Sequence, residues 1–286
     1  MNNLENILAK FDELQACVII PTYNNSATLA AVITDASQYS NNIIVVNDGS
    51  TDSTEAIAKS FPQVQLISYS NNVGKGWALR KAFIYGVEHN YKFAITIDSD
   101  GQHFAKDLPA FINKLEQVQD AIIIGSRNMD QSSVPGKSSF GNKFSNFWFK
   151  VETGITSPDT QSGFRAYPLD LLKDIHFFTK KYEFEIEVLV RAVWKGVNIE
   201  TIPVTVYYAP KEIRVSHFRP FKDFTRISIL NTVLVIITFL YIKPRNLLRM
   251  LFGKKKICTS LKNSYLIQMN QICLKHFQFH LAFLWA

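Results

Sequence analysis

The chain has 286 residues, of which 47% are hydrophobic and 19% are charged, and its formal net charge is +7. This length is enough for one large α/β domain or two small ones, and the apolar fraction excludes a chain that is disordered throughout. The positive charge is unevenly distributed, because 13 of the 31 Lys and Arg residues but only 2 of the 24 Asp and Glu residues lie from Thr205 onward.

The first 204 residues therefore hold 18 basic and 22 acidic side chains. A mildly acidic body argues against a nucleic-acid groove, and a basic C-terminal segment suits an anionic membrane surface. The three cysteines match neither a C-x-x-C pair nor a secreted disulfide framework, which fits reduced thiols in the cytosol. The first 16 residues carry three acidic side chains and no long apolar run, so we expect no signal peptide.

Strand and helix patterns alternate along the first half of the chain. Short apolar runs predict strands at 17–20, 43–46, 64–67, 93–97 and 121–125, and helices are expected at 1–15, 27–39, 53–59, 75–89 and 108–118. This alternation predicts an α/β fold with a mostly parallel central sheet and helices on both faces. Four strand ends carry polar clusters, at 21–25, 47–52, 98–103 and 125–128. Because ligands bind beyond the carboxyl ends of parallel strands, we expect a site at this edge.

The strand at 93–97 ends in two carboxylates, Asp98 and Asp100. Side chains two residues apart on a strand point the same way, so both can project from its carboxyl end. Together with Gln102 they could hold a hard divalent cation, whose remaining positions a diphosphate would fill. The alternative is a polar turn with no ligand.

Two further clusters also allow two interpretations. The segment that begins at Asp48 could be a turn and helix cap, or Asp48 could accept hydrogen bonds from a base or ribose. The loop at 71–76 places Lys75 near a helix N-terminus, but its spacing matches neither the Walker nor the dinucleotide fingerprint. This argues against a cofactor of the NAD or ATP-kinase type. Arg127, after the strand at 121–125, could pair with a phosphate.

In combination, the motifs at 20–24, 46–50, 72–76, 98–103 and 125–127 resemble those of family 2 glycosyltransferases with the GT-A fold. Within that family the chain is most similar to dolichyl- or polyprenyl-phosphate sugar synthases, from Cys17 to Arg226. The resemblance implies a GDP- or UDP-sugar donor, a lipid-phosphate acceptor, and Mg²⁺ or Mn²⁺ as cofactor. The chain departs from the family pattern at Asn25, where Glu is common, and at 104–105, where prolines are common.

The resemblance also implies residue roles. The base and ribose would contact Pro21, Tyr23, Asn25 and Asp48, with Lys75 close to the nucleotide. The metal would bind Asp98, Asp100 and Gln102, with Asp98 also near the donor, and Arg127 would approach the phosphates or the acceptor. The stretch at 159–167 matches a signature beneath the donor sugar and supplies Asp159, Gln161 and Arg165. Glu187, in a helix expected at 182–194, matches a family glutamate, and Arg214 and Ser216 match a segment that folds over the diphosphate.

The C-terminal third contains a 16-residue apolar run at 227–242, flanked by basic residues. As a helix it would measure about 24 Å, against about 30 Å for the hydrocarbon core of a bilayer. We therefore expect an interfacial helix or a single short span at the cytoplasmic face of a membrane. The expected organisation is an N-terminal helix at 1–15, a GT-A domain at 16–226, a membrane-associated helix at 227–252 and a basic tail at 253–286. An aromatic helix at 140–151 is expected mainly to pack against the core.

Glycosyl transfer passes through an oxocarbenium-like transition state, and charge grows on the leaving diphosphate. An anionic lipid phosphate needs no strong base, and we expect inversion by a single displacement. A sugar hydroxyl acceptor would need a carboxylate base, for which Asp159 is the candidate. The alternative function is thus a family 2 enzyme that extends a cell-surface polysaccharide or a lipid-linked glycan. A third hypothesis is a binding or scaffold protein without turnover. The intact set of Asp98, Asp100 and Gln102 argues against it.

Overall fold

The computed structural model describes residues 3–128, 136–208 and 219–252, without the side chains of 3, 136–139, 220 and 252. The chain divides into two compact units, Met1–Leu234 and Val235–Ala286. The first unit contains every strand of the described residues, and the candidate site lies in this unit.

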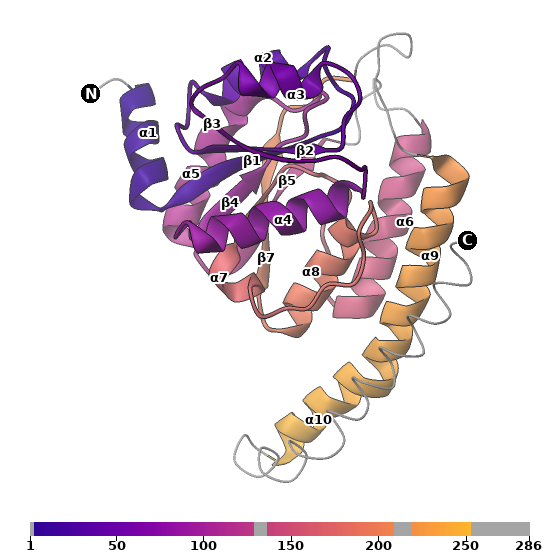
Figure 1. The fold of residues 1–286 in the computed structure, drawn as a ribbon. Coiled ribbons are helices and arrows are strands. Elements are labelled where there is room, and N and C mark those ends of the chain that lie inside the picture. The colour runs from indigo at the N-terminus through magenta and orange to yellow at the C-terminus, as the bar shows by residue number, and fades with distance from the viewer. Residues whose placement is uncertain (1–2, 129–135, 209–218, 253–286) are drawn as a thin grey trace. The chain divides into compact units, whose positions relative to one another are not determined.

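Seven strands form one sheet in the order β3-β2-β1-β4-β6-β5-β7 (Figure 1). Their bounds are β1 Ala16–Thr22, β2 Ile43–Asp48, β3 Val64–Tyr69, β4 Phe93–Thr96, β5 Ala121–Arg127, β6 Arg165–Pro168 and β7 Asn198–Val204. Pairing is parallel except around β6, which is antiparallel to both β4 and β5. The predicted mostly parallel sheet is confirmed.

Alternate residues of each central strand face opposite sides of the sheet, as extended backbone requires. Val18 and Ile20 pack in one buried cluster, while Cys17 and Ile19 pack in the other. The first face is covered by α1 (Asn3–Glu13), α2 (Leu29–Ala36), α3 (Thr54–Lys59) and α5 (Leu108–Gln117), and the second by α4 (Lys75–Glu88), α6 (Gly136–Thr153), α7 (Leu169–Leu172) and α8 (Phe184–Trp194). Burial on both faces explains why the strands are continuous apolar runs.

Two strands, β6 and β7, are absent from the sequence-based expectations. β6 has only four residues, RAYP, and it begins with Arg165, so no apolar run marks it. β7 reads NIETIPV, and its Pro203 is tolerated because β7 is the last strand of the sheet. Both strands depend on pairing with β5, which a local pattern does not reveal.

The apolar run near residue 230 is helical, as expected. α9 spans Pro220–Ile237, a π-helical turn follows at Thr238–Ile242, and α10 spans Lys243–Phe252. Within the described ranges, Phe221–Leu251 is the one helix long and apolar enough to cross a membrane, a finding that rests on its length of 31 residues and its composition. Of its most apolar window, 22% is buried within the protein.

Candidate active site

The polar loops that follow β1, β2 and β4 are linked by hydrogen bonds. These strands are neighbours and parallel, so their carboxyl ends lie at one edge of the sheet. The Asn24 amide donates to Ser50 Oγ at 2.9 Å, and Asn25 Nδ2 donates to Ser99 Oγ at 2.9 Å. β5 runs in the same direction as β4, since both are antiparallel to β6. The predicted convergence of four polar clusters is therefore confirmed.

Lys75, Asp98 and Glu185 form the charged centre of this edge. Lys75 Nζ lies 2.7 Å from Asp98 Oδ1 and 3.0 Å from Glu185 Oε1. Burial lowers the pKa of Lys75, but the two carboxylates outweigh it and hold this pKa above its ordinary value. Burial raises the pKa of Asp98, but Lys75 outweighs it and holds this pKa below its ordinary value. Lys75 and Asp98 are therefore both charged at neutral pH.

Gly163 brings the backbone against this charged centre. A Cβ atom on Gly163 would lie 2.8 Å from Asp98 Oδ2, 2.9 Å from Lys75 Nζ and 3.1 Å from Glu185 Oε1. The Gly163 carbonyl accepts a hydrogen bond of 2.7 Å from Thr96 Oγ1, at the end of β4. The segment predicted to lie beneath the donor sugar thus contacts Asp98, and only glycine fits at its closest point.

The turn after β4 carries the predicted metal ligands. Gly101 has φ = 71°, and the Gln102 amide donates to Asp100 Oδ1 at 3.0 Å. The Gln102 carbonyl accepts a hydrogen bond of 2.8 Å from the Tyr207 amide, so the chain after β7 covers part of this turn. Asp98, Asp100 and Gln102 are all partly exposed.

Arg127 and Asp159 form a second ion pair at the end of β5. Asp159 Oδ2 accepts from Arg127 Nε at 2.7 Å and from the Arg127 amide at 3.1 Å. Asp159 Oδ1 accepts from Arg127 Nη2, from Asn142 Nδ2 on α6 and from the Gln161 amide. Burial lowers the pKa of Arg127, but Asp159 outweighs it and holds this pKa above its ordinary value. The Asp159 side chain has no exposed surface, so its carboxylate is fully occupied by protein donors.

Arg165 is buried and bonded to the protein. Its guanidinium donates to the carbonyl oxygens of Ser162 at 2.6 Å, Thr160 at 2.9 Å and Glu185 at 2.7 Å. It also lies 3.3 Å from the Tyr167 hydroxyl. Arg165 therefore connects the 160–162 loop to the first turn of α8 and leaves no exposed group for a substrate.

Asp48 and Asn25 both lie beneath the surface. The Asp48 carboxylate accepts from Asn72 Nδ2 and from the amides of Val73 and Gly74, at 2.8–2.9 Å. Burial raises the pKa of Asp48, and the Val73 amide opposes that rise. Asn25 also accepts a hydrogen bond of 2.9 Å from Thr28 Oγ1. Both residues shape the loops at this edge, and Asp48 fixes the loop that precedes Lys75.

Glu187 acts on the same region from α8. Its carboxylate accepts from the amides of Phe178 and Thr179, at 2.9–3.2 Å, and from Thr179 Oγ1 at 2.6 Å. The loop that it anchors supplies the Lys180 carbonyl, which accepts from the Trp77 amide at 2.8 Å. Glu187 thus supports the start of α4, where Lys75 lies, without reaching the charged centre.

The remaining predicted residues differ in accessibility. Pro21 is buried, Tyr23 is half-buried and Gln161 is exposed. The Gln161 amide group lies 3.3 Å from the position a Cβ atom would take on Gly141 of α6. Arg214 and Ser216 lie outside the described residues.

A model of the family described as "Glycosyl transferase family 2" matches residues 17–175, more than half of the chain. The chain belongs to this family. It is similar to polyprenol monophosphomannose synthase of Mycolicibacterium smegmatis, at 28% identity over 70% of this chain and 79% of the relative. It is also similar to undecaprenyl-phosphate mannosyltransferase of Micrococcus luteus, at 28% identity over 67% of this chain and 83% of the relative. The resemblance to polyprenyl-phosphate sugar synthases is confirmed.

Solved glycosyltransferase structures share the fold. Glucosyl-3-phosphoglycerate synthase of Mycobacterium tuberculosis, in complex with Mn²⁺, UDP and glucosyl-3-phosphoglycerate, has a TM-score of 0.61 at 19% identity, over 82% of this chain and 83% of that chain. Its complex with Mg²⁺ and UDP has a TM-score of 0.59 at 20% identity, over 82% of each chain. The GT-A fold predicted from the sequence is therefore confirmed.

The turn after β4 carries oxygen ligands of the kind that a divalent metal prefers. Within the described ranges no group of three or more His, Cys, Asp or Glu residues could hold an ion by itself. Mg²⁺ commonly takes one or two carboxylates and completes its shell with substrate phosphates and water. Two partly exposed carboxylates and the Gln102 amide oxygen match that pattern, and the ionised state of Asp98 favours it.

Three residues near the candidate site were given no role by the sequence-based expectations. They are Glu185, Asn142 and His103. The His103 ring is 7% exposed, packs on Phe164, and Nδ1 has no hydrogen-bond partner in the described structure. Burial lowers the pKa of His103 to about 4, against the attraction of Asp98, so the ring is neutral at pH 7. Glu185 could have been found only from the α8 register, which places it one turn above Leu189, facing the sheet edge.

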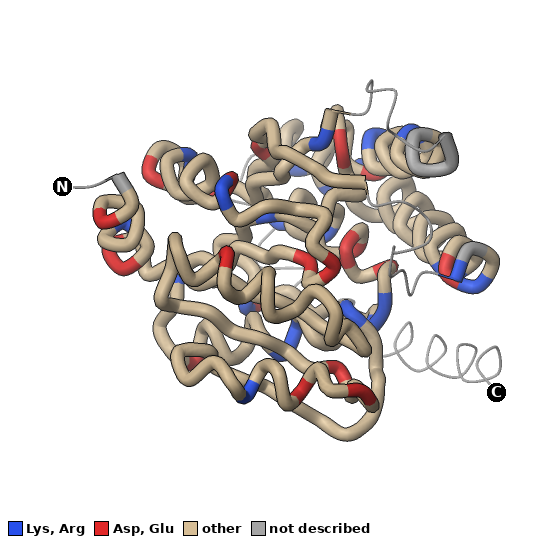
Figure 2. The backbone as a smooth tube through the Cα atoms, turned by 90° about the horizontal axis from the view of Figure 1, so that it is seen from above, with Lys and Arg blue, Asp and Glu red and all other residues tan. Residues whose placement is uncertain are grey.

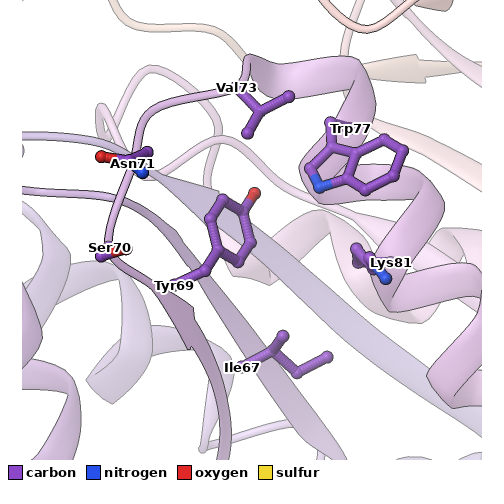
Figure 3. Close-up of a pocket in the computed structure, with 7 residues that line it drawn as sticks. All are labelled: Ile67, Tyr69, Ser70, Asn71, Val73, Trp77 and Lys81. Atoms are coloured by element: carbon purple, nitrogen blue, oxygen red, sulfur yellow. The ribbon is translucent and has the colours of Figure 1, made fainter.

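Two open hollows of about 420 Å³ flank the site. The first lies between the end of β3 and α4, and it is lined by Ile67, Tyr69, Ser70, Asn71, Val73, Trp77 and Lys81 (Figure 3). The second includes Arg127 and is lined mainly by β7 and the carboxyl end of β5. Neither hollow is lined by Lys75, Asp98 or Glu185, so the candidate site is defined by its charged and polar residues.

Acidic and basic residues are interspersed along the described backbone (Figure 2).

Proposed function

We propose that the protein is a metal-dependent, inverting glycosyltransferase that moves a sugar from a GDP- or UDP-sugar to a polyprenyl- or dolichyl-phosphate-type lipid at the cytoplasmic face of a membrane. The relatives named above, which act on polyprenyl phosphates, support this acceptor class. One observation carries the choice between acceptors: the Asp159 carboxylate is buried and accepts five hydrogen bonds from the protein. A base for a sugar hydroxyl would need a free oxygen within hydrogen-bond reach of the acceptor.

The lipid phosphate is already anionic at neutral pH and can attack without losing a proton. Its oxygen forms a bond to the anomeric carbon as the bond from that carbon to the nucleoside diphosphate breaks, and the diphosphate leaves from the opposite face. This single displacement inverts the anomeric configuration. No step requires a protein residue to accept a proton.

The chain's residues bind and orient the two reactants. Mg²⁺ or Mn²⁺ at Asp98, Asp100 and Gln102 would supply positive charge to the leaving diphosphate. Lys75 lies 2.7 Å from Asp98 and would contribute a second positive charge on the same side. Pro21 and Tyr23 would contact the base, above the loops that Asn25 and Asp48 hold in place. Arg127, fixed by Asp159, would direct its guanidinium toward the acceptor phosphate.

Other predicted residues would act through these. Arg165 and Glu187 would support Gly163 and the start of α4, and Gln161 would contact the donor sugar. Arg214 and Ser216 would close over the diphosphate. The exposed apolar residues of α9, the π-helical turn and α10, among them Phe221, Leu240 and Met250, would contact lipid.

The test is to incubate the purified full chain with radiolabelled UDP-glucose, UDP-N-acetylglucosamine or GDP-mannose, Mn²⁺ and undecaprenyl phosphate in detergent. We expect label to enter the organic phase with one of the donors, only with metal, as a product that mild acid hydrolyses. Undecaprenol, which lacks the phosphate, is the matched control. Transfer to undecaprenol or to a free sugar, but not to undecaprenyl phosphate, would move the assignment to hydroxyl acceptors.

A further inference from the structure

Lys75 is shared by two carboxylates from opposite sides of the site. Its ammonium lies 2.7 Å from Asp98 Oδ1 at the end of β4 and 3.0 Å from Glu185 Oε1 on α8. The three side chains are 18%, 27% and 14% exposed, so solvent screens their interaction only in part. One positive charge therefore faces two negative charges.

The backbone fixes this arrangement. The Glu185 carbonyl accepts from the buried Arg165 guanidinium at 2.7 Å, which fixes the first turn of α8. A Cβ atom on Gly76 would lie 2.3 Å from Phe184 Cβ, so α4 and α8 are in direct contact beside Lys75. The backbone of Gly163 lies directly against all three side chains. The two carboxylates thus stay within reach of the same ammonium.

A divalent cation on Asp98 would conflict with this pairing. Asp98 Oδ1 already accepts from Lys75, and an ammonium beside a divalent cation is repelled by it. The bond from Lys75 to Asp98 is then weakened, and Lys75 needs another anion nearby if it is to remain at the site. Glu185 is that anion in the described structure.

We propose that Glu185 is a positioning residue that holds Lys75 when a divalent cation occupies Asp98, so that Asp98 can bind the metal while Lys75 stays beside the diphosphate. This inference rests on the proposed function, because it requires a metal at Asp98. Glu185 does not contact the reacting atoms; it acts through Lys75.

The experiment measures Mn²⁺ binding by electron paramagnetic resonance, without nucleotide, for the full chain and for Glu185→Gln, Lys75→Gln and the double variant. Glu185→Gln leaves Asp98 as the only charged partner of Lys75 among the described residues, so the ammonium competes more strongly with Mn²⁺. We expect a loss of affinity of about fivefold or more, within the range of coupling between contacting residues. Lys75→Gln should tighten binding, and in that background Glu185→Gln should change affinity by less than about twofold.

Glu185→Asp provides a second variant that keeps the charge but shortens the side chain away from Lys75. It should weaken Mn²⁺ binding in the same direction as Glu185→Gln. Glu200→Gln, which removes a surface partner of Lys114, is the control for loss of one negative charge. Thermal melts confirm that each variant is folded.

Three results would overturn the inference. The first is an equal loss on Glu185→Gln with and without Lys75, which would show a direct charge effect on the metal. The second is an unchanged affinity in Glu185→Gln and Glu185→Asp. The third is an absence of Mn²⁺ binding in both the wild type and Lys75→Gln. This result would also reject the metal site of the proposed function, whereas the first two results would reject only the role of Glu185.

Discussion

At the scale of single residues, the charged side chains of the site are paired, and pairing determines how each can act. Asp98 is paired with Lys75, and Asp159 with Arg127. Asp98 remains partly exposed, whereas Asp159 is completely covered. Asp98 can therefore exchange Lys75 for a ligand, whereas Asp159 holds the Arg127 guanidinium in place.

Asp98→Asn should abolish metal-dependent nucleotide binding while the fold is retained. The amide removes an anionic ligand, and Glu185 still neutralises Lys75. Calorimetric titration of UDP and of GDP, each with Mn²⁺ and with EDTA, measures the effect. Nucleotide affinity in the wild type that is the same in EDTA as in Mn²⁺ would contradict the metal site.

Asp159→Asn should keep a measurable rate of transfer to lipid phosphate. The amide preserves the shape of the side chain but weakens the hold on Arg127, so we expect a lower rate without a new pH dependence. Between about pH 6 and 8 the profile should be flat, since a phosphate monoester has its second pKa near 6. A general base would instead contribute about 10²–10⁴-fold to the rate. Complete loss of activity with intact donor binding would favour the hydroxyl acceptor.

At the scale of elements, α8 connects the two halves of the site. Its first turn carries Glu185 beside Lys75, and two residues later Glu187 anchors the loop that supports the start of α4. Side chains two residues apart on a helix point in different directions. Glu185 therefore stabilises the position of Lys75 directly, and Glu187 does so from another side through the loop that supports α4.

Helix α6 carries a buried carboxyl group at Glu152, which makes stability depend on pH. Burial raises the pKa of Glu152 from 4.5 to about 8. Between those values the folded protein binds more protons than the unfolded chain, so the free energy of unfolding falls as the pH rises. Glu152→Gln removes this loss and should stabilise the protein at pH 8 by a few kcal/mol, on the order of 1–4. At pH 4.5 the difference should nearly vanish.

Urea denaturation at pH 5 and pH 8 measures this effect, with Glu13→Gln on the exposed side of α1 as the control. A stability difference between Glu152→Gln and wild type that is the same at both pH values would show that ionisation of Glu152 is not its cause.

The sequence was informative where a local pattern carries the structure. β1, β2, β4 and β5 are apolar runs that end in polar clusters, so their direction and the edge that holds the site could be predicted. β6 and the ion pair between Arg127 and Asp159 could not, because they depend on segments 32 or more residues apart. The role of Glu185 was missed for the same reason, since its partner Lys75 is 110 residues away.

At the scale of the whole molecule, the two units differ in charge. The sequence from Val235 onward contains eight Lys and Arg residues and no Asp or Glu. Attraction to anionic lipid is worth about 1 kcal/mol for each basic residue near the surface. This C-terminal charge and the apolar helix would together favour a membrane surface.

Neutralising Lys254, Lys255 and Lys256 to Gln in the full chain should weaken binding to anionic liposomes. Three lost charges correspond to up to about 3 kcal/mol, or roughly a hundredfold in partition coefficient. Flotation on phosphatidylserine-containing liposomes measures this. The matched control neutralises three exposed lysines of the first unit, Lys59, Lys92 and Lys173. Equal loss in both variants would show that the position of the charges is unimportant.

The insertion of β6 between β4 and β5 has a consequence for biosynthesis. β4 and β5 leave the ribosome before β6, and neither pairs with the other in the finished sheet. Until residues 165–168 are made, the nascent chain has two unpaired strand edges at its centre, and such edges promote aggregation. Gly163 reaches Asp98 through the same insertion, so the strand that fills this gap in the sheet also places the backbone of Gly163 beside Asp98.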